Sequence, residues 1–307
     1  MTSIIVGVEG SARSEDAVAF ARRIAEASGA QIKLAYAYPY DTRLSRASNA
    51  GFKEAVRDDA LATLDRMTEG LEGVENVETA AIADVSPARA LQELAERDGA
   101  ALVVLGSTHH SKLGRILAGT TAERLLHGAP CPVAVVPHGF CEHAATPIKT
   151  IAVGHDGSKE AEAALSAAVA ASQALGAVLR VVRVFSANEY GMPALVSNPG
   201  FTTSPDEFRQ SAHDALDKAV ADMKEKGVEA EPVFVSGDPV SDLVGQSKRA
   251  DLLFLGSRAY GPHRAVLLGS VSGRVVREAE CPVIVVPRGV EAPLAPLFAT
   301  ASVALPV

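Results

Sequence analysis

The 307-residue sequence contains no tryptophan, and aromatic residues make up only 5% of it. Hydrophobic residues nevertheless make up 48%, so the core must be built mainly from valine, leucine, isoleucine and alanine, the residues that fill helix-covered parallel sheets. This composition favours an α/β fold over a β-sandwich. The length of the chain predicts two domains, each large enough to bury its own core.

Cysteine is scarce. There are three cysteines, an odd number, and none are in CxxC spacing. Such a set does not predict a disulfide framework or a thiolate metal site, and it suits a reducing cytoplasm. Cys131 and Cys281 occupy matching contexts, each directly before a proline, which predicts small buried side chains and not redox centres.

An excess of positive charge and long apolar runs are also missing. The formal net charge of −8 and the pI near 5.5 leave no basic surface to attract phosphate backbones, which argues against nucleic-acid binding. The N-terminus has no basic region followed by an apolar stretch, and no run reaches the roughly 18 residues that a membrane helix needs. We therefore expect a soluble, cytoplasmic protein without a nucleic-acid or membrane partner.

The chain contains an internal repeat. IIVGVEGS at 4–11 returns as IAVGHDGS at 151–158, an offset of 147 residues, and CPVAVVPHG at 131–139 returns as CPVIVVPRG at 281–289, an offset of 150. A match at a nearly fixed period reveals a duplicated unit. The sequence therefore predicts two copies of one domain.

The expected domain limits follow from this repeat. We predict copy one over 1–139 and copy two over 150–289, with a polar, proline-containing linker at 140–149. Residues 290–307 match nothing in copy one and are predicted to form a loosely held tail.

Short apolar runs alternate with helical patterns in each copy. In copy one the expected strands are 4–8, 32–37, 77–83, 101–105 and 133–136, and the longest expected helix has its apolar stripe at Phe52, Val56, Ala60, Leu64, Met67 and Leu71. This alternation predicts right-handed crossovers and a parallel sheet with helices on both faces. The last strand of each copy would be an exposed apolar edge, so we expect the two to pair with each other.

Two loops in each copy follow strands at the edge where open parallel sheets bind ligands. The first contains Glu9-Gly10-Ser11 in copy one and Asp156-Gly157-Ser158 in copy two, and the second runs over 106–120 and 256–270. Glycines allow close approach of the backbone, and a helix start favours an anion. No Walker A or GxGxxG motif is present, so these loops fit either a phosphate site or ordinary structural glycines and N-caps.

The whole pattern resembles the universal stress protein family over nearly all of both copies. It consists of a strand, Asp-Gly-Ser, a helix, Gly-Ser after the fourth strand, a loop, Gly-Ser/Thr, a helix and CPVxVVP. The resemblance implies two tandem Rossmann-like domains, each a five-stranded parallel sheet with helices on both faces, paired through the fifth strands. In one branch of the family it also implies ATP or a related adenine nucleotide, with or without Mg²⁺, at a loop of the form G-x2-G-x9-G-S/T.

The resemblance assigns nucleotide-binding residues in both copies. They are Asp156, Val184, Gly256, Ser257, Gly269 and Ser270 in copy two, and Glu9, Ala37, Gly106, Ser107, Gly119 and Thr120 in copy one. The middle glycine of the loop is replaced by Ala259 in copy two and by His109 in copy one. Because a larger side chain there would hinder a positive φ or a phosphate contact, copy two is expected to be the better site.

We predict no catalytic residues and no metal site, because no nucleophile has a paired base and no carboxylates cluster. His155 and Asp156 are neighbours in an extended strand and should face opposite sides. The predicted function is a regulatory stress-response protein that binds an adenine nucleotide. Two alternatives stay open, a member that binds no nucleotide and acts through protein contacts, and a slow ATP hydrolase. Whether the whole chain forms a further homodimer is also open.

Overall fold

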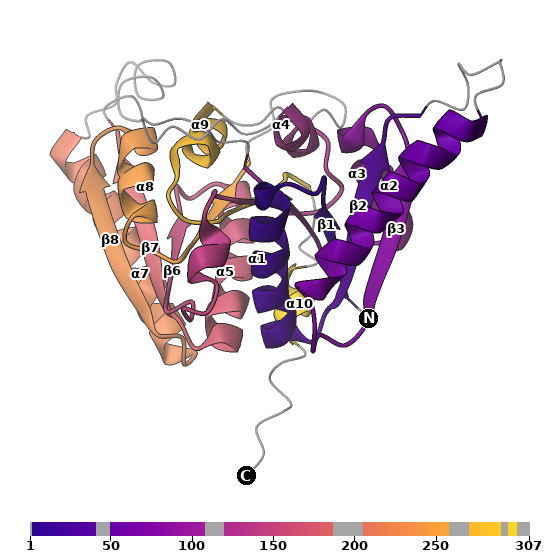
Figure 1. The fold of residues 1–307 in the computed structure, drawn as a ribbon. Helices are drawn as coiled ribbons and strands as arrows, with labels where there is room; N and C mark the ends of the chain where they lie inside the picture. Colours follow the sequence, from indigo (N-terminus) through magenta and orange to yellow (C-terminus); the bar gives the residue numbers. More distant parts are fainter. Residues whose placement is uncertain are drawn as a thin grey trace, which may run out of the picture.

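The computed structural model describes residues 2–40, 50–107, 120–186, 205–257, 270–289 and 294–299. These residues form one ten-stranded sheet flanked by helices, in the strand order β3-β2-β1-β4-β5-β10-β9-β6-β7-β8 (Figure 1). From either end of the sheet to its centre the order is the same, so the repeat in the sequence is a repeat in the structure. The expected fold of two tandem Rossmann-like α/β domains is confirmed.

Copy one alternates strands and helices as the apolar pattern predicts. Its elements are β1 (Ser3–Gly7), α1 (Ala12–Ser28), β2 (Gln31–Tyr38), α2 (Ala50–Glu69), β3 (Val77–Ala83), α3 (Pro87–Asp98), β4 (Leu102–Gly106), α4 (Thr120–Leu126) and β5 (Val133–Val136). Helix α1 ends at Gly29, whose φ of 67° lies in the left-handed region. Glycine adopts that conformation without steric cost, which stops the helix and turns the chain into β2.

Copy two repeats this order after a short 3-10 helix, η1 (Phe140–His143), which lies within the expected linker. Its elements are β6 (Thr150–Gly154), α5 (Lys159–Leu175), β7 (Val178–Phe185), α7 (Pro205–Glu225), β8 (Ala230–Ser236), α8 (Pro239–Ser247), β9 (Leu252–Gly256), α9 (Ser270–Glu278) and β10 (Val283–Val286).

The two copies meet at their fifth strands. Strands pair in parallel within each copy, whereas β5 and β10 pair antiparallel, with Ala134 opposite Ile284 at the centre. Both of these residues are fully buried. The pairing removes two apolar edges that would otherwise be open to other chains, and it confirms the predicted joining of the copies through these strands.

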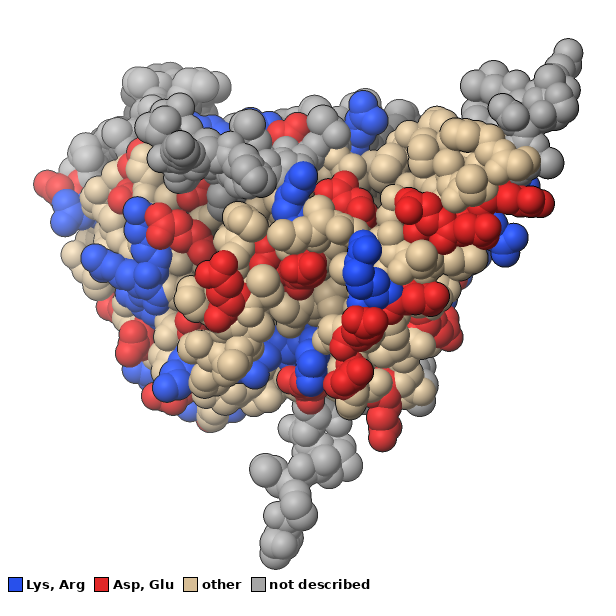
Figure 2. Space-filling model, viewed as in Figure 1, with Lys and Arg blue, Asp and Glu red and all other residues tan. Residues whose placement is uncertain are grey.

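Helices cover both faces of the sheet. One face is packed by α1, α2, α5 and α7, and the other by α3, α4, α8 and α9, each over its own apolar cluster (Figure 1). Phe20 and Phe254 are the largest fully buried side chains, and most of the core is aliphatic, as the composition predicts. Over the face with α1 and α5, positive and negative side chains are interspersed (Figure 2).

Helix α2 departs from the expected burial at its first turns. Leu64 and Met67 lie in the core, as the apolar stripe predicts, but the side chain of Phe52 is 52% exposed. Figure 1 shows the start of α2 reaching past the end of the sheet. The apolar stripe of α2 therefore extends beyond the part of the sheet on which it can pack.

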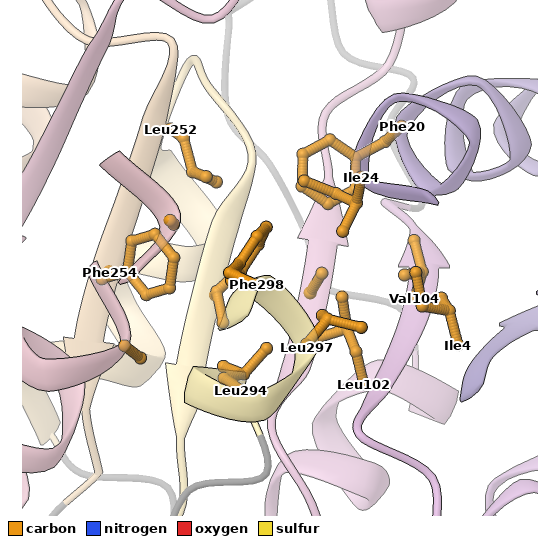
Figure 3. Packing of buried hydrophobic residues seen from close by; sticks show 14 of the residues in the cluster. Ile4, Phe20, Ile24, Leu102, Val104, Leu252, Phe254, Leu294, Leu297 and Phe298 are labelled. Atoms are coloured by element: carbon orange, nitrogen blue, oxygen red, sulfur yellow. The ribbon is translucent and has the colours of Figure 1, made fainter. Parts of the chain in front are cut away.

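Residues Leu294–Ala299 form a helix, α10, so the expectation of a loosely held tail is wrong for this segment. Leu294 and Leu297 are fully buried and Phe298 is 2% exposed. The helix packs against α5 and α1, and Figure 3 places its three apolar side chains between Phe254 and Leu252 of copy two and residues such as Phe20 of copy one. Burial of these side chains joins the cores of the two copies into one.

Asp16, on α1, anchors the segment 138–141 that follows β5 to copy one. Its carboxylate is buried, accepts hydrogen bonds from the backbone N–H groups of Gly139 (3.0 Å) and Cys141 (2.9 Å), and lies 3.3 Å from Nδ1 of His138. Ala163 occupies the matching place in copy two, 147 residues further on. This attachment therefore exists in copy one alone.

Candidate nucleotide site

A cavity of about 320 Å³ opens at the carboxyl ends of β1, β2 and β4 in copy one. Strand β1 lies between β2 and β4, so the chain leaves β1 to one side and later returns to the other, the arrangement that opens a crevice in a doubly wound sheet. Apolar wall residues include Ala35, Leu91 and Leu105, and polar ones include Arg13 and Tyr36. The cavity lies where the strand-end rule predicts a ligand site.

Three of the predicted copy-one residues meet at this cavity. Glu9, Ala37 and Gly106 line it, each from the end of a different strand. Ser107 follows Gly106 and is 1% exposed. Gly119 lies outside the described residues, and Thr120 begins α4.

The predicted copy-two residues occupy the corresponding strand ends. Val184 lies on β7, Gly256 ends β9 and Ser257 follows it, while Asp156 follows β6. Gly269 lies outside the described residues, as do His109 and Ala259, and Ser270 begins α9.

Gly106 and Gly256 have a structural reason to be glycine. A β-carbon at position 106 would overlap the backbone carbonyl oxygen of Arg13, and one at position 256 would overlap that of Glu160. The helix after strand one therefore packs backbone to backbone on the end of strand four in each copy. This packing requires glycine whether or not a phosphate approaches it.

The loop after β1 holds the carboxylate of Glu9 at the rim of the cavity. Gly10 has a φ of 78°, a value that favours glycine. The backbone N–H of Glu9 donates to Oγ of Ser14 (2.9 Å), and the Ser11 hydroxyl donates to Oε1 of Glu9 (3.0 Å). The guanidinium of Arg13 lies 3.6 Å from the same oxygen. A carboxylate so placed can accept hydrogen bonds from hydroxyl groups of a ligand.

The matching loop of copy two has different polar contacts. The N–H of Ser158 donates to Oδ1 of Asp156 (3.0 Å), and Oγ of Ser158 accepts from the N–H of Ala161 (3.2 Å), which caps α5. Glu160, in the first turn of α5, forms an ion pair of 3.1 Å with Arg288. The two copies therefore share a backbone path but not a charge pattern.

The imidazole of His155 contacts Glu162. Its Nε2 lies 2.9 Å from Oε1 of Glu162, and its side chain is 14% exposed. Among the residues that the structure describes, no group of three or more His, Cys, Asp or Glu side chains is placed to hold a metal ion.

The sequence did not single out several groups that line the cavity, including Arg13, Ser14, Tyr36 and Thr121. Burial, followed by the nearby carboxylates of Asp59 and Glu9, raises the pKa of Tyr36, so its hydroxyl is a hydrogen-bond donor at neutral pH. Arg13 and Ser14 lie two and three residues after Ser11 of the Glu-Gly-Ser loop. This closeness in sequence to the predicted loop could have identified them.

The serines after the fourth strands are buried in both copies. Ser107 is 1% exposed and Ser257 fully buried, and neither hydroxyl has a hydrogen-bond partner among the described residues. Their N–H groups donate to Val136 and Val286, which fixes the backbone at the start of each loop. Buried hydroxyls without a partner are uncommon, so both positions are consistent with a polar group arriving from elsewhere.

The fold and the repeated strand ends together define a doubly wound α/β protein built twice, with a cavity at the carboxyl edge of the sheet in copy one. The family model for the universal stress protein family matches residues 1–137 and 147–287. The chain therefore belongs to the universal stress protein family, as a tandem member with two such domains.

Individual relatives agree with this assignment. A universal stress protein of Mycolicibacterium smegmatis is 30% identical over 297 residues, 92% of this chain and 96% of that protein. One of Mycobacterium tuberculosis is 34% identical over 188 residues, 61% of each chain. The solved structure of a universal stress protein of Archaeoglobus fulgidus covers 94% of this chain and 96% of its own, with a TM-score of 0.68 and 20% identity, and so shares the fold. Within the described residues, no helix is long and apolar enough to cross a membrane.

Proposed function

We propose that this chain is a cytoplasmic regulator in the stress response that binds ATP or a related adenine nucleotide at the carboxyl edge of its sheet. The observation that supports this most is the 320 Å³ cavity bounded by Glu9, Ala37 and Gly106. Its volume lies within the range of small-ligand pockets, roughly 300–1,000 Å³, and its walls combine apolar surface with a few polar groups.

Each part of the cavity suits one part of a nucleotide. The backbone at Ala37 and the apolar wall with Leu91 and Leu105 suit an adenine ring. The carboxylate of Glu9 suits ribose hydroxyls. Arg13 and the start of the loop at Gly106 suit phosphates, with Gly119 and Thr120 at the far end of that loop.

Copy two offers the same places through Asp156, Val184, Gly256, Ser257, Gly269 and Ser270. Mg²⁺ would accompany the phosphates and neutralise part of their charge. We propose that occupancy of these sites is a regulatory state and not a step in rapid turnover.

Calorimetric titration of nucleotide-free protein with ATP and Mg²⁺ tests the proposal, because it gives affinity and number of sites together. Ala37→Leu adds side-chain volume at the cavity wall and should weaken binding in copy one at least about tenfold. Ala62→Leu, the same change on the exposed face of α2, should have no effect. Absence of binding at millimolar ATP would overturn the proposal and favour a member that acts through protein contacts.

A second measurement distinguishes slow hydrolysis of ATP from binding without turnover. Phosphate release from the wild-type chain is compared with release from the Ala37→Leu variant. If copy one is a regulatory site, both proteins should release phosphate at the same rate, whereas release that falls in the variant would identify slow hydrolysis at copy one.

A further inference from the structure

One position beside the two crevices has opposite charge in the two copies. Arg13 and Glu160 are 147 residues apart, the same offset that relates the Glu-Gly-Ser and Asp-Gly-Ser loops. Both lie in the first turn of the helix after strand one. Both backbones pack on the glycine that begins the second loop, Gly106 or Gly256. The two backbone positions are therefore matched in space as well as in sequence.

Arg13 brings a cation to the crevice of copy one. Its side chain lines the cavity and is 32% exposed, and its guanidinium is 3.6 Å from Glu9, which is 61% exposed. An ion pair of that length and exposure is weak. The guanidinium can therefore turn to phosphate oxygens, for which its planar set of donors is well suited.

Glu160 brings an anion to the same place in copy two. Its side chain is 14% exposed and pairs at 3.1 Å with Arg288, which follows β10 and is 60% exposed. The arginine offsets the carboxylate but adds no net positive charge. A ligand phosphate placed here would compete with Glu160 for Arg288 and would be repelled by the carboxylate.

Among the residues that the structure describes, another charge that differs between the copies is Arg183, which replaces Tyr36 at the same offset. Arg183 lies on β7 in register with Phe234. The ring of Phe234 contacts that of His213 on α7, and Phe185, two residues beyond Arg183, contacts Phe208 of α7. Arg183 therefore faces the α7 side of the sheet. Its charge is present both with Glu160 and in a Glu160→Gln variant, so it cancels when those two proteins are compared.

We propose that Arg13 and Glu160 set opposite phosphate preferences, so that copy one selects ATP over AMP more strongly than copy two does. This inference rests on the proposed adenine-nucleotide function. The preference is the difference between the binding free energies of ATP and AMP at one site. Contacts that both nucleotides make, such as those to adenine, therefore cancel in this difference. Opposite charges at one position give the two sites opposite electrostatic contributions as phosphates are added.

The test is a titration with ATP and with AMP, without added magnesium, of the full chain and three variants. Ala37→Leu blocks copy one, so the nucleotide affinity that this variant retains is the affinity of copy two. The binding that the wild-type chain shows in addition is that of copy one. We expect the ATP-to-AMP affinity ratio to be at least about tenfold higher in copy one. Glu160→Gln in the Ala37→Leu chain should raise ATP affinity about fivefold and AMP affinity less than about twofold. Arg13→Gln should lower the ATP affinity of copy one about tenfold.

Matched controls remove one charge of the same sign elsewhere. Arg23→Gln lies on α1 ten residues beyond Arg13, and Glu229→Gln lies before β8, at the opposite edge of the sheet. Both should leave the ratios unchanged. Equal ratios at the two sites, or no gain of ATP affinity with Glu160→Gln, would overturn the inference and leave nucleotide binding intact. Failure of every protein to bind either nucleotide would overturn the proposed function and the inference with it.

Discussion

Gly106 lies against the backbone carbonyl of Arg13 so closely that no β-carbon fits between them. Gly256 stands in the same relation to Glu160. The glycine that opens each proposed phosphate loop is thus part of the contact between a helix and the central sheet. Its presence in both copies follows from packing alone, before any ligand is considered.

Gly106→Ala should lower the free energy of unfolding by about 3 kcal/mol, because the atoms it meets belong to the backbone and cannot rotate away. Gly256→Ala should behave similarly. Gly245→Ala is the control, since a β-carbon at that position on α8 meets nothing within 4 Å, and it should stabilise the protein by up to about 1 kcal/mol. Urea denaturation measures all three. Equal stabilities would contradict the packing argument.

Asp16→Ala should lower the free energy of unfolding by about 2–3 kcal/mol. The change leaves the N–H groups of Gly139 and Cys141 without the carboxylate that accepts their hydrogen bonds. Glu15→Ala, at the exposed neighbouring position, should change stability by less than about 0.5 kcal/mol. Thermal unfolding of the two variants compares them directly. If both were equally stable, Asp16 would not be anchoring this segment.

Two phenylalanines give a matched comparison for α10. Phe298 is 2% exposed and Phe52 is 52% exposed. Phe298→Ala should cost about 3–5 kcal/mol through the cavity it leaves between the copies, and Phe52→Ala less than about 0.5 kcal/mol. Denaturant titration gives both values. A small effect at Phe298 would mean that α10 contributes little to the joint core.

The three cysteines should differ in reactivity. Burial raises the pKa of Cys131 to about 12 and also raises that of Cys281. Burial, followed by the hydrogen bond and charge of Asp16, raises the pKa of the exposed Cys141 to about 11. A disulfide reagent should therefore modify only Cys141 in the folded chain. Its rate should rise about tenfold per pH unit until the pH nears 11, because the thiolate is the reacting form.

Counting modified thiols checks this expectation. The folded Cys141→Ser variant should show none, and the unfolded wild-type chain should show all three. Rapid modification of two or more thiols in the folded protein would show that the strand entrances near Cys131 and Cys281 open readily.

Much of the fold was predictable from local pattern. The strands expected at 77–83 and 133–136 coincide with β3 and β5, because their apolar runs are bounded by clear turn residues. Helix α10 was not expected, although Leu294, Leu297 and Phe298 have helical spacing. This segment contains Pro296 and has no counterpart in copy one. The apolar groove that receives it exists only once α1 and α5 lie together, so its burial depends on tertiary structure.

The candidate site was predictable in position more than in chemistry. The rule for parallel sheets selected the loops with Glu9 and Gly106, and the family resemblance added Ala37; all three line the cavity. The difference between Arg13 and Glu160 was not predicted. An internal repeat is recognised from the residues that are alike in both copies, so a position that differs gives no signal. The roles assigned to Gly119 and Gly269 stay predictions, since both lie outside the described residues.

The antiparallel pairing of β5 with β10 occurs within one polypeptide. A homodimer of single domains must carry any substitution in both halves, and it separates on dilution. Here the partners are covalently joined, so their association does not depend on concentration and their ratio is fixed at synthesis. Because the two domains are encoded separately, they do not need to have identical sequences. A difference such as Asp16 in copy one and Ala163 in copy two can therefore arise in one half while the other half is unchanged.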